Sequence, residues 1–398
     1  MSATSRALPA GPPAPLRITR IEGPSVGFVS TYPPTKCGIA TFTASLREAM
    51  ALRRSGVVAS VDVPGVARFG GEVVAELVSG SRSSLARAAA ALDRFDVAIV
   101  QHEFGIYGGR HGQEVVDLAD ALACPVIVVL HTVLRSPSVE QRSIVEQLAE
   151  RAALVVVQSS VARARLLDAH AVPPERVRVV PHGAPPNFSP HDGRIIPGRR
   201  PVVLSWGLLS SGKGIEFGID AMALLHDLDP SPRYVVHGET HPRVFEREGD
   251  AYRELLEERV RRRGLEDVVE FDDGYLGTAS VPASIRAADV VLLPYRSRDQ
   301  AVSGVLVEAI ASGKPVVATG FPHARELLAR GSGIVVPHDD SAAIAEALRD
   351  VLRDPERRAR MAAAARARAP ALFWGNVGGT YRELAALAAA APARRRLP

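Results

Sequence analysis

The chain has 398 residues, of which 46% are hydrophobic and 23% are charged. This length predicts about two domains, and the composition is that of a globular protein, which excludes collagen, coiled coil and extensive disorder. The net charge of +4 is too small to favour nucleic acid as a partner. The chain has two cysteines, Cys37 and Cys124, which exclude a disulfide framework and fit a reducing compartment.

The N-terminal residues 1–17 are rich in proline, alanine and serine and lack the apolar core of a signal peptide, so we expect a disordered tail there. The most apolar internal run, Leu122–Leu134, contains Pro125 and His131 and is too short to span a bilayer. The sequence therefore predicts a soluble cytoplasmic protein with at most peripheral membrane contact, through an arginine-rich helix. It leaves a homodimer open.

Short apolar runs alternate with segments of helical spacing through the first half of the chain. The runs are apolar on both faces, which is typical of parallel strands covered by helices. The expected strands are Val26–Ser30, Val97–Gln101, Val126–Leu130, Leu154–Gln158 and Val177–Val180. A helix is expected over Ala40–Ala51. We place a first domain at 18–183 and, because residues 183–200 include four prolines, a linker at 184–200.

A second series of the same kind fills 201–376. Its expected strands are Val202–Trp206, Tyr234–His237, Val268–Phe271, Val290–Pro294, Pro315–Ala318 and Gly333–Val336, with helices between them. A last helix is expected over Val377–Ala390. Two such halves predict an α/β protein of two doubly wound, Rossmann-like domains that face a central cleft, with ligands at the carboxyl ends of the strands.

The most specific local signal is the segment from Ser205 to Gly214, which connects a strand to a helix. Glycines let the backbone approach a ligand, the helix start offers N–H groups, and Lys213 adds a point charge, so the segment predicts a phosphate site. Only three of the 48 basic residues are lysines, and an ammonium is not interchangeable with a guanidinium. A P-loop NTPase is an alternative, but Gly214 stands where its Ser or Thr is required. A plain glycine turn with an exposed lysine is the other.

A second helix start follows near Ser303. Its N–H groups could accept an anion, and Glu308 within that helix could accept hydrogen bonds from a diol. The alternative for Glu308 alone is an exposed helical glutamate.

Polar residues also end strands in the first half. Gln101-His102-Glu103 leads into a glycine-rich loop, where His102 and Glu103 diverge and cannot chelate one ion. His102 either contacts an acceptor or bonds to backbone. His131 ends another strand and favours sugar contact over proton transfer. Thr240 and His241 follow a strand of the second half and face the cleft by position. The remaining histidines are expected at the surface or in the linker.

These motifs, taken in order and spacing, resemble the retaining nucleotide-sugar glycosyltransferases of family 4, which have the GT-B fold; the acceptor and sugar contacts named for His102 and His131 are what this resemblance implies. The resemblance covers nearly the whole chain. It rests on the segments 33–40, 101–105, 130–132, 179–183, 211–214 and 308–315.

The resemblance implies a role for each matching residue. Lys213 binds the donor diphosphate, Glu308 holds the ribose hydroxyls, His131 lies beside the transferred sugar, and the Gln300–Gly304 loop faces the donor. The catalytic set is then Lys213, His131, Gln300 and Glu308. The implied donor-binding set is Gly38, Gly207, Ser211, Gly212, Lys213, Gly214, Thr240, His241, Tyr275, Leu276, Ser303, Gly304, Val305 and Glu308. The implied acceptor-binding set is Cys37, Gln101, His102, Glu103 and His131.

The resemblance further implies transfer of a hexose, mannose or glucose, from a nucleotide-diphosphate sugar to a sugar, glycolipid or polysaccharide, without metal or cofactor. It also implies that the segment 377–398 packs back on the first domain. Two positions depart from the family pattern, because Leu208 replaces a phosphate-binding arginine and Gln300 replaces a glutamate. The alternatives are a disaccharide phosphorylase on the same fold and a non-catalytic nucleotide-sugar binder.

Overall fold

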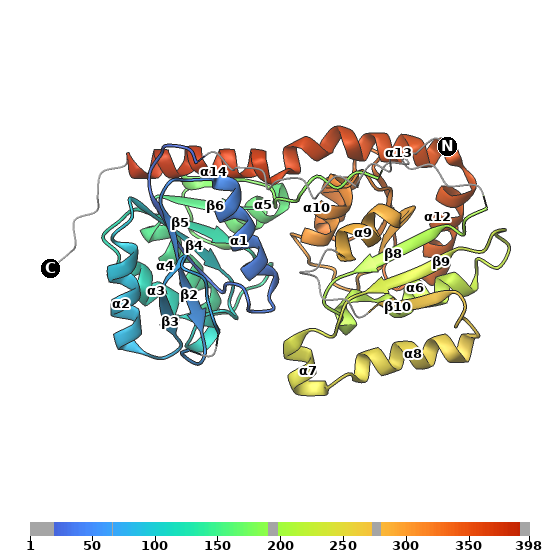
Figure 1. The fold of residues 1–398 in the computed structure, drawn as a ribbon, viewed down its shortest axis with the longest axis horizontal. Coiled ribbons are helices and arrows are strands. Elements are labelled where there is room, and N and C mark those ends of the chain that lie inside the picture. The colour runs from blue at the N-terminus through green and yellow to red at the C-terminus, as the bar shows by residue number, and fades with distance from the viewer. Residues whose placement is uncertain (1–19, 66, 190–197, 273–279, 391–398) are drawn as a thin grey trace, which may run out of the picture.

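The computed structural model describes residues 20–65, 67–189, 198–272 and 280–390. It contains two α/β domains that lie side by side (Figure 1). The expected disordered tail and the end of the C-terminal segment lie outside the described residues, as do residues 190–197 of the expected linker. In the part of the chain so described, no helix is both long and apolar enough to cross a membrane.

The N-terminal domain is built on a seven-stranded sheet of order β3-β2-β1-β4-β5-β6-β7, in which neighbouring strands run parallel. The strands are β1 (Val26–Ser30), β2 (Ser55–Val61), β3 (Val73–Val78), β4 (Val97–His102), β5 (Val126–Leu130), β6 (Leu154–Val157) and β7 (Val177–Val179). The central strands β1, β4, β5 and β6 are buried along their whole length, because helices cover both faces. Strands β2 and β3 were not predicted from the sequence.

Helices on the two faces of this sheet bury separate cores. On one face lie α2 (Arg82–Leu92), α3 (Glu114–Ala121), α4 (Val139–Arg151) and α5 (Ser160–Ala169). On the other lie α1 (Gly38–Met50) and the C-terminal helix α14 (Trp374–Ala389). Short 3-10 turns occur at η1 (Arg110–Gly112) and η2 (Pro174–Arg176).

The C-terminal domain has a six-stranded parallel sheet of order β10-β9-β8-β11-β12-β13. Its strands are β8 (Val202–Trp206), β9 (Arg233–His237), β10 (Val269–Asp272), β11 (Val290–Leu293), β12 (Val316–Thr319) and β13 (Gly333–Val336). All six lie within a residue of the expected positions. This agreement reflects short runs of Val, Ile and Leu that are clearly bounded by turns.

One face of this second sheet is covered by α6 (Ile215–Ala223), α8 (Ala251–Arg263) and α12 (Ser341–Arg353). The other face is covered by α9 (Ser280–Ala287), α10 (Gly304–Ala311) and α11 (Pro322–Leu328). The remaining elements are η3 (Ser211–Lys213), α7 (Pro242–Glu248), α13 (Pro355–Arg368) and η4 (Ala369–Leu372).

The chain passes between the domains twice, and the two passages pair with each other. The Ala184 N–H donates to Leu372 O at 2.8 Å, and the Trp374 N–H donates to Ala184 O at 3.0 Å. From there α14 runs back over the N-terminal domain (Figure 1), where the Arg382 guanidinium donates to the carbonyls of Ala49 and Met50 at the end of α1.

Lys314, at the start of β12, has a structural role. The residue is 3% exposed, and its ammonium donates to the carbonyls of Arg286 and Ala288 at 2.8 and 2.7 Å. Burial lowers the pKa of Lys314 to about 8. A compact ammonium fits between two carbonyls where a planar guanidinium would not.

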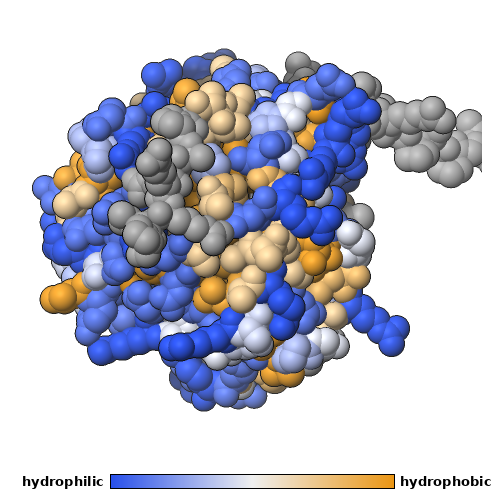
Figure 2. Space-filling view, turned by 90° about the vertical axis from the view of Figure 1, so that its left-hand side faces the viewer, coloured by the Kyte–Doolittle hydropathy of each residue, from blue (hydrophilic) through white to orange (hydrophobic). Residues whose placement is uncertain are grey.

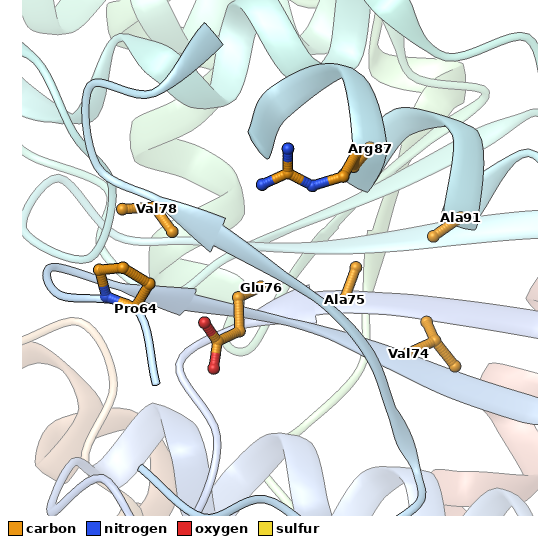
Figure 3. Close-up of a pocket in the computed structure, with 7 residues that line it drawn as sticks. All are labelled: Pro64, Val74, Ala75, Glu76, Val78, Arg87 and Ala91. Carbon is orange, nitrogen blue, oxygen red and sulfur yellow. The ribbon is translucent and has the colours of Figure 1, made fainter. Parts of the chain in front are cut away.

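The end of the molecule that carries the N-terminal domain is mostly hydrophilic, with hydrophobic residues in patches between polar ones (Figure 2). A hollow of about 340 Å³ lies against edge strand β3 and helix α2. There the Glu76 carboxylate and the Arg87 guanidinium point in different directions (Figure 3).

Candidate functional site

Loops that follow strands of both sheets meet between the domains. Lys36, after β1, is paired with Glu239, after β9, and the Ser159 hydroxyl, after β6, donates to Ala301 O at 2.8 Å. His182 lies against the start of α10, where a Cβ at Gly304 would be 3.0 Å from its Nε2. We call this region the interdomain junction. It brings together residues of both domains that the sequence motifs singled out.

Lys213 lies in the loop that leaves β8, and Tyr295 fixes its position. The ammonium is 3.2 Å from the Tyr295 hydroxyl and 4.4 Å from the centre of its ring. Tyr295 is itself buried and stacks on Phe321 with ring centres 5.1 Å apart. A Cβ at Gly207 would be 3.9 Å from the same ammonium. The ammonium therefore lies beside Gly207, which has no side chain to keep a phosphate away from the backbone.

Gly214 ends the short turn η3 and begins α6 in the left-handed region, with φ of 63°. A Cβ there would be 2.1 Å from Pro294 O, so neither Ser nor Thr fits. This geometry removes the P-loop NTPase alternative, which needs a hydroxyl at that position.

The start of α6 differs from expectation. The Ile215 N–H donates to the Tyr252 hydroxyl at 3.1 Å, and this hydroxyl donates to the Glu216 carboxylate at 2.6 Å. One of the N–H groups expected to face a phosphate is therefore already bonded to protein, and the helix start carries an acidic residue. The turn Ser211–Lys213 remains as the part of the loop suited to an anion.

Glu308 lies in the second turn of α10, recessed among other side chains but not sealed from solvent. The Trp206 indole Nε1–H, at the end of β8, donates to Glu308 Oε2 at 3.0 Å. Burial raises the pKa of Glu308, and the Trp206 hydrogen bond opposes this rise. The carboxylate is therefore not an exposed helical glutamate, and its orientation is fixed by the strand that leads to the Lys213 loop.

Hydrogen bonds within the loop before α10, and one to His323 of α11, hold this loop in shape. The Ser303 N–H donates to His323 Nδ1 at 2.9 Å, and the Leu306 N–H donates to Ser303 Oγ at 3.3 Å. The Gln300 amide donates to Val302 O at 2.9 Å. Some of the polar groups of this loop are thus used to hold its own shape. Gly304 and Val305 follow as the first residues of α10.

His131 is locked between two glutamines from neighbouring strands. Its Nε2–H donates to Gln101 Oε1 at 2.8 Å, and its Nδ1 accepts from Gln158 Nε2 at 3.1 Å. Burial, with His182 and His102 nearby, lowers the pKa of His131 to about 3. The ring is neutral at physiological pH and both nitrogens are engaged, which disfavours proton transfer. A sugar contact would have to use the ring edge or the backbone.

His102 corrects both expectations made for it. It is completely buried, with its ring edge-on to Phe104 at 4.8 Å between centres. Within the described structure neither ring nitrogen has a hydrogen-bond partner, and burial lowers its pKa to about 4. His102 therefore lies beneath the surface and contacts neither an acceptor nor the backbone. The Glu103 carboxylate accepts from the Thr132 hydroxyl and the Phe104 N–H, both within the N-terminal domain.

The other expected site residues occupy the loops around the junction. Cys37 precedes α1, which starts at Gly38, without capping it through its side chain. The Thr240 hydroxyl donates to Asp250 at 2.6 Å, and the His241 N–H donates to Leu209 O at 2.9 Å. Tyr275 and Leu276 lie outside the described residues.

Several residues that shape the junction were not singled out in the sequence. They are Trp206, Tyr295, His182 and His323. Contrary to expectation, His323 is buried, as is His237, and burial lowers the pKa of His182 and of His323 to about 4 each. The available signal was their position: Trp206 ends a strand, Tyr295 and His182 follow strands within three residues, and His323 lies at a helix start. Among the described residues, no three His, Cys, Asp or Glu side chains are grouped so that they could hold a metal ion.

Two family models match the chain over adjacent stretches. Residues 39–188 match the family described as Glycosyltransferase Family 4, and residues 191–368 match Glycosyl transferases group 1. The chain belongs to this family of group 1, family 4 glycosyltransferases, as the sequence motifs predicted.

Individual relatives agree with this assignment. The chain is 32% identical over 295 residues to D-inositol 3-phosphate glycosyltransferase of Corynebacterium glutamicum (strain R), covering 67% of this chain and 68% of the relative. It is 32% identical over 192 residues to Alpha-D-kanosaminyltransferase of Streptomyces kanamyceticus, covering 46% of each. The chain thus spans about half to two thirds of the length of these curated relatives.

Solved structures share the fold of this chain. Anabaena HepE, whose crystal structure contains UDP and glucose, superposes with a TM-score of 0.72 at 20% identity, covering 91% of this chain and 99% of that one. The GT-B fold predicted from the sequence, with two Rossmann-like domains, is therefore confirmed.

Proposed function

We propose that this protein transfers a hexose from a nucleotide-diphosphate sugar to a sugar, glycolipid or polysaccharide acceptor, with retention of configuration. The observation that carries the proposal is that one domain holds both a Lys213 ammonium fixed on Tyr295 and a Glu308 carboxylate oriented by Trp206. An ammonium suits a diphosphate and a recessed carboxylate suits the two hydroxyls of a ribose. Both residues approach the junction from the carboxyl edge of one parallel sheet, where such folds bind nucleotides.

Departure of the nucleoside diphosphate leaves an electron-poor sugar and places negative charge on the leaving phosphate. The Lys213 ammonium and the N–H groups of Ser211 and Gly212 would stabilise that charge electrostatically, so the step needs no metal ion; the Lys213 N–H itself donates to Ser210 O. The acceptor hydroxyl then attacks from the side of the departing phosphate, and a phosphate oxygen takes its proton. His131 is unsuited to that proton transfer, because burial holds its pKa near 3.

Activity measurements identify the donor and the acceptor. GDP-mannose and UDP-glucose are the donors to test first, with release of GDP or UDP as the readout. D-inositol 3-phosphate is a rational first acceptor, because the Corynebacterium glutamicum relative is named for it. Release of a nucleoside diphosphate supports a transferase, whereas a disaccharide phosphorylase would release a sugar phosphate without a nucleotide sugar.

Lys213→Ala tests the site. We expect turnover to fall by about a hundredfold or more, the usual loss when one strong electrostatic stabiliser is removed. Arg360→Ala is the matched control, because it removes a cation from the exposed surface of α13 and should leave turnover unchanged. Turnover in Lys213→Ala close to that of the unmodified chain would refute the assignment.

A further inference from the structure

Lys36 and Glu239 form an ion pair across the interdomain junction. The Lys36 ammonium is 2.9 Å from Glu239 Oε1 and 3.2 Å from Oε2. The side chains are 51% and 31% exposed, and a pair so exposed contributes at most about 1 kcal/mol to stability. Holding the domains together is therefore a weak explanation for this contact.

The position of Glu239 points to another explanation. The Leu209 N–H donates to Glu239 O at 2.9 Å, and Leu209 forms a β-bridge with Thr240. Leu209 belongs to the same loop as Lys213. The Glu239 carboxylate therefore holds the Lys36 ammonium beside the loop that carries Lys213, but from the opposite domain.

We propose that Lys36 provides a second ammonium for the donor diphosphate. When no donor is bound, the Glu239 carboxylate pairs with Lys36 in place of the diphosphate. This inference rests on the function proposed above. A diphosphate diester carries two negative charges, of which Lys213 balances one, and Leu208 in the same loop adds none. Arg296 lies against the same loop but is paired with Glu216 and Asp339, so we assign the second positive charge to the N-terminal domain, and binding of the donor then draws on both domains.

The choice of lysine fits this exchange of partners. Nearly all other cations of the chain are arginine. A guanidinium would grip the Glu239 carboxylate with two parallel hydrogen bonds, whereas an ammonium on a flexible stem can leave a carboxylate for a phosphate at little cost. A charged hydrogen bond to phosphate in the junction is stronger than the exposed ion pair it replaces.

The test compares Lys36→Ala with Glu239→Gln by calorimetric titration. The ligands are GDP or UDP, whichever binds the unmodified chain, and the nucleoside of that diphosphate. We expect Lys36→Ala to weaken diphosphate binding by about tenfold and to leave nucleoside binding unchanged. Glu239→Gln should leave diphosphate binding unchanged or tighten it, because the competing carboxylate is gone.

A simple latch between the domains predicts a different pattern. Either substitution would break the latch, so both would change diphosphate binding in the same direction, and that result would overturn the proposal. Equal loss of nucleoside and diphosphate binding in Lys36→Ala would overturn it as well. Both side chains are partly exposed, and the melting temperatures of the two variants check that the fold is intact.

Lys213→Ala separates this proposal from the proposed function. If Lys213→Ala weakens diphosphate binding and Lys36→Ala does not, the role of Lys36 fails alone. If neither variant weakens binding, the diphosphate site itself is misplaced and both proposals fail.

Discussion

One hydrogen bond between Trp206 and Glu308 joins the strand that leads to the Lys213 loop to the helix that carries the proposed ribose-binding carboxylate. The indole N–H donates to Oε2 at 3.0 Å, which leaves Oε1 and the second lone pair of Oε2 to accept from a diol. Trp206 is 4% exposed and immobilised in the apolar core of the C-terminal domain. It therefore acts as a positioning residue, because it restricts the carboxylate to one orientation.

Trp206→Phe tests this positioning role. An aromatic ring is retained, but the N–H donor is lost together with part of the indole volume, so we expect the KM for the donor to rise by about five- to tenfold, in line with the loss of one hydrogen bond to a charged group, with kcat within about twofold. The Trp206 hydrogen bond lowers the pKa of Glu308 against the effect of burial. Its removal raises that pKa, so the acid limb of kcat/KM against pH should move to higher pH.

The matched control is Tyr234→Phe, which removes a buried hydroxyl bonded to Ser205 on the same strand as Trp206. It should change stability without moving the pH profile. An unshifted acid limb in Trp206→Phe would show that the indole does not tune the carboxylate.

At the scale of elements, the loop from Gly207 to Gly214 obeys a steric rule of the backbone. It must turn from β8 into α6 while passing Pro294, which follows β11, and only a residue without a Cβ can do so at position 214. The neighbouring Gly212 has no such restriction, since a Cβ there would meet only Ser210 Oγ at 3.9 Å.

Gly214→Ser should therefore destabilise the fold by about 2–4 kcal/mol, because it combines an unfavourable φ with a backbone clash. Gly212→Ala should change stability by less than about 1 kcal/mol. Chemical unfolding of both variants measures the difference. A Gly214→Ser variant as stable as Gly212→Ala would mean that the loop can adopt another path.

The elements themselves were predictable to different degrees. All six strands of the C-terminal domain are apolar runs bounded by turns, and the sequence pattern located them. In the N-terminal domain the pattern missed β2, whose apolar run is short and bounded by Gly56 and Ser60, and β3, an edge strand that is only partly buried. An edge strand has one neighbour and less buried area, so its hydrophobic pattern is weak.

The site was predictable only where the signal is local. The loop that carries Lys213 and the helix that carries Glu308 were found, because each combines a strand end with a helix start. The pairing of His131 with Gln101 and Gln158, and of Lys36 with Glu239, depends on segments that meet only in the folded chain. A chain read one residue after another has no signal for such contacts.

At the scale of the whole molecule, the N-terminal domain supports the loop that precedes α10 in the other domain. Ala301 belongs to the apolar core of the N-terminal domain, Ser159 donates to its carbonyl, and Arg165 donates to Asp299 O at 2.6 Å. The Glu326 carboxylate of α11 accepts from the N–H groups of Ser160 and Val161 at 3.0 and 3.1 Å. It thus caps α5 across the junction, where the helix dipole favours a negative charge.

Glu326→Ala should remove that cap, at a cost of about 1 kcal/mol, and loosen the loop 299–303 together with the start of α5. We expect faster amide hydrogen exchange in these two segments and a severalfold higher KM for the donor, because the loop would no longer be held in one shape. Glu346→Ala, on the exposed face of α12, is the control and should alter neither. If exchange accelerated at α5 but not in the loop 299–303, the N-terminal domain would not be what holds the loop, and the donor site would be complete within its own domain.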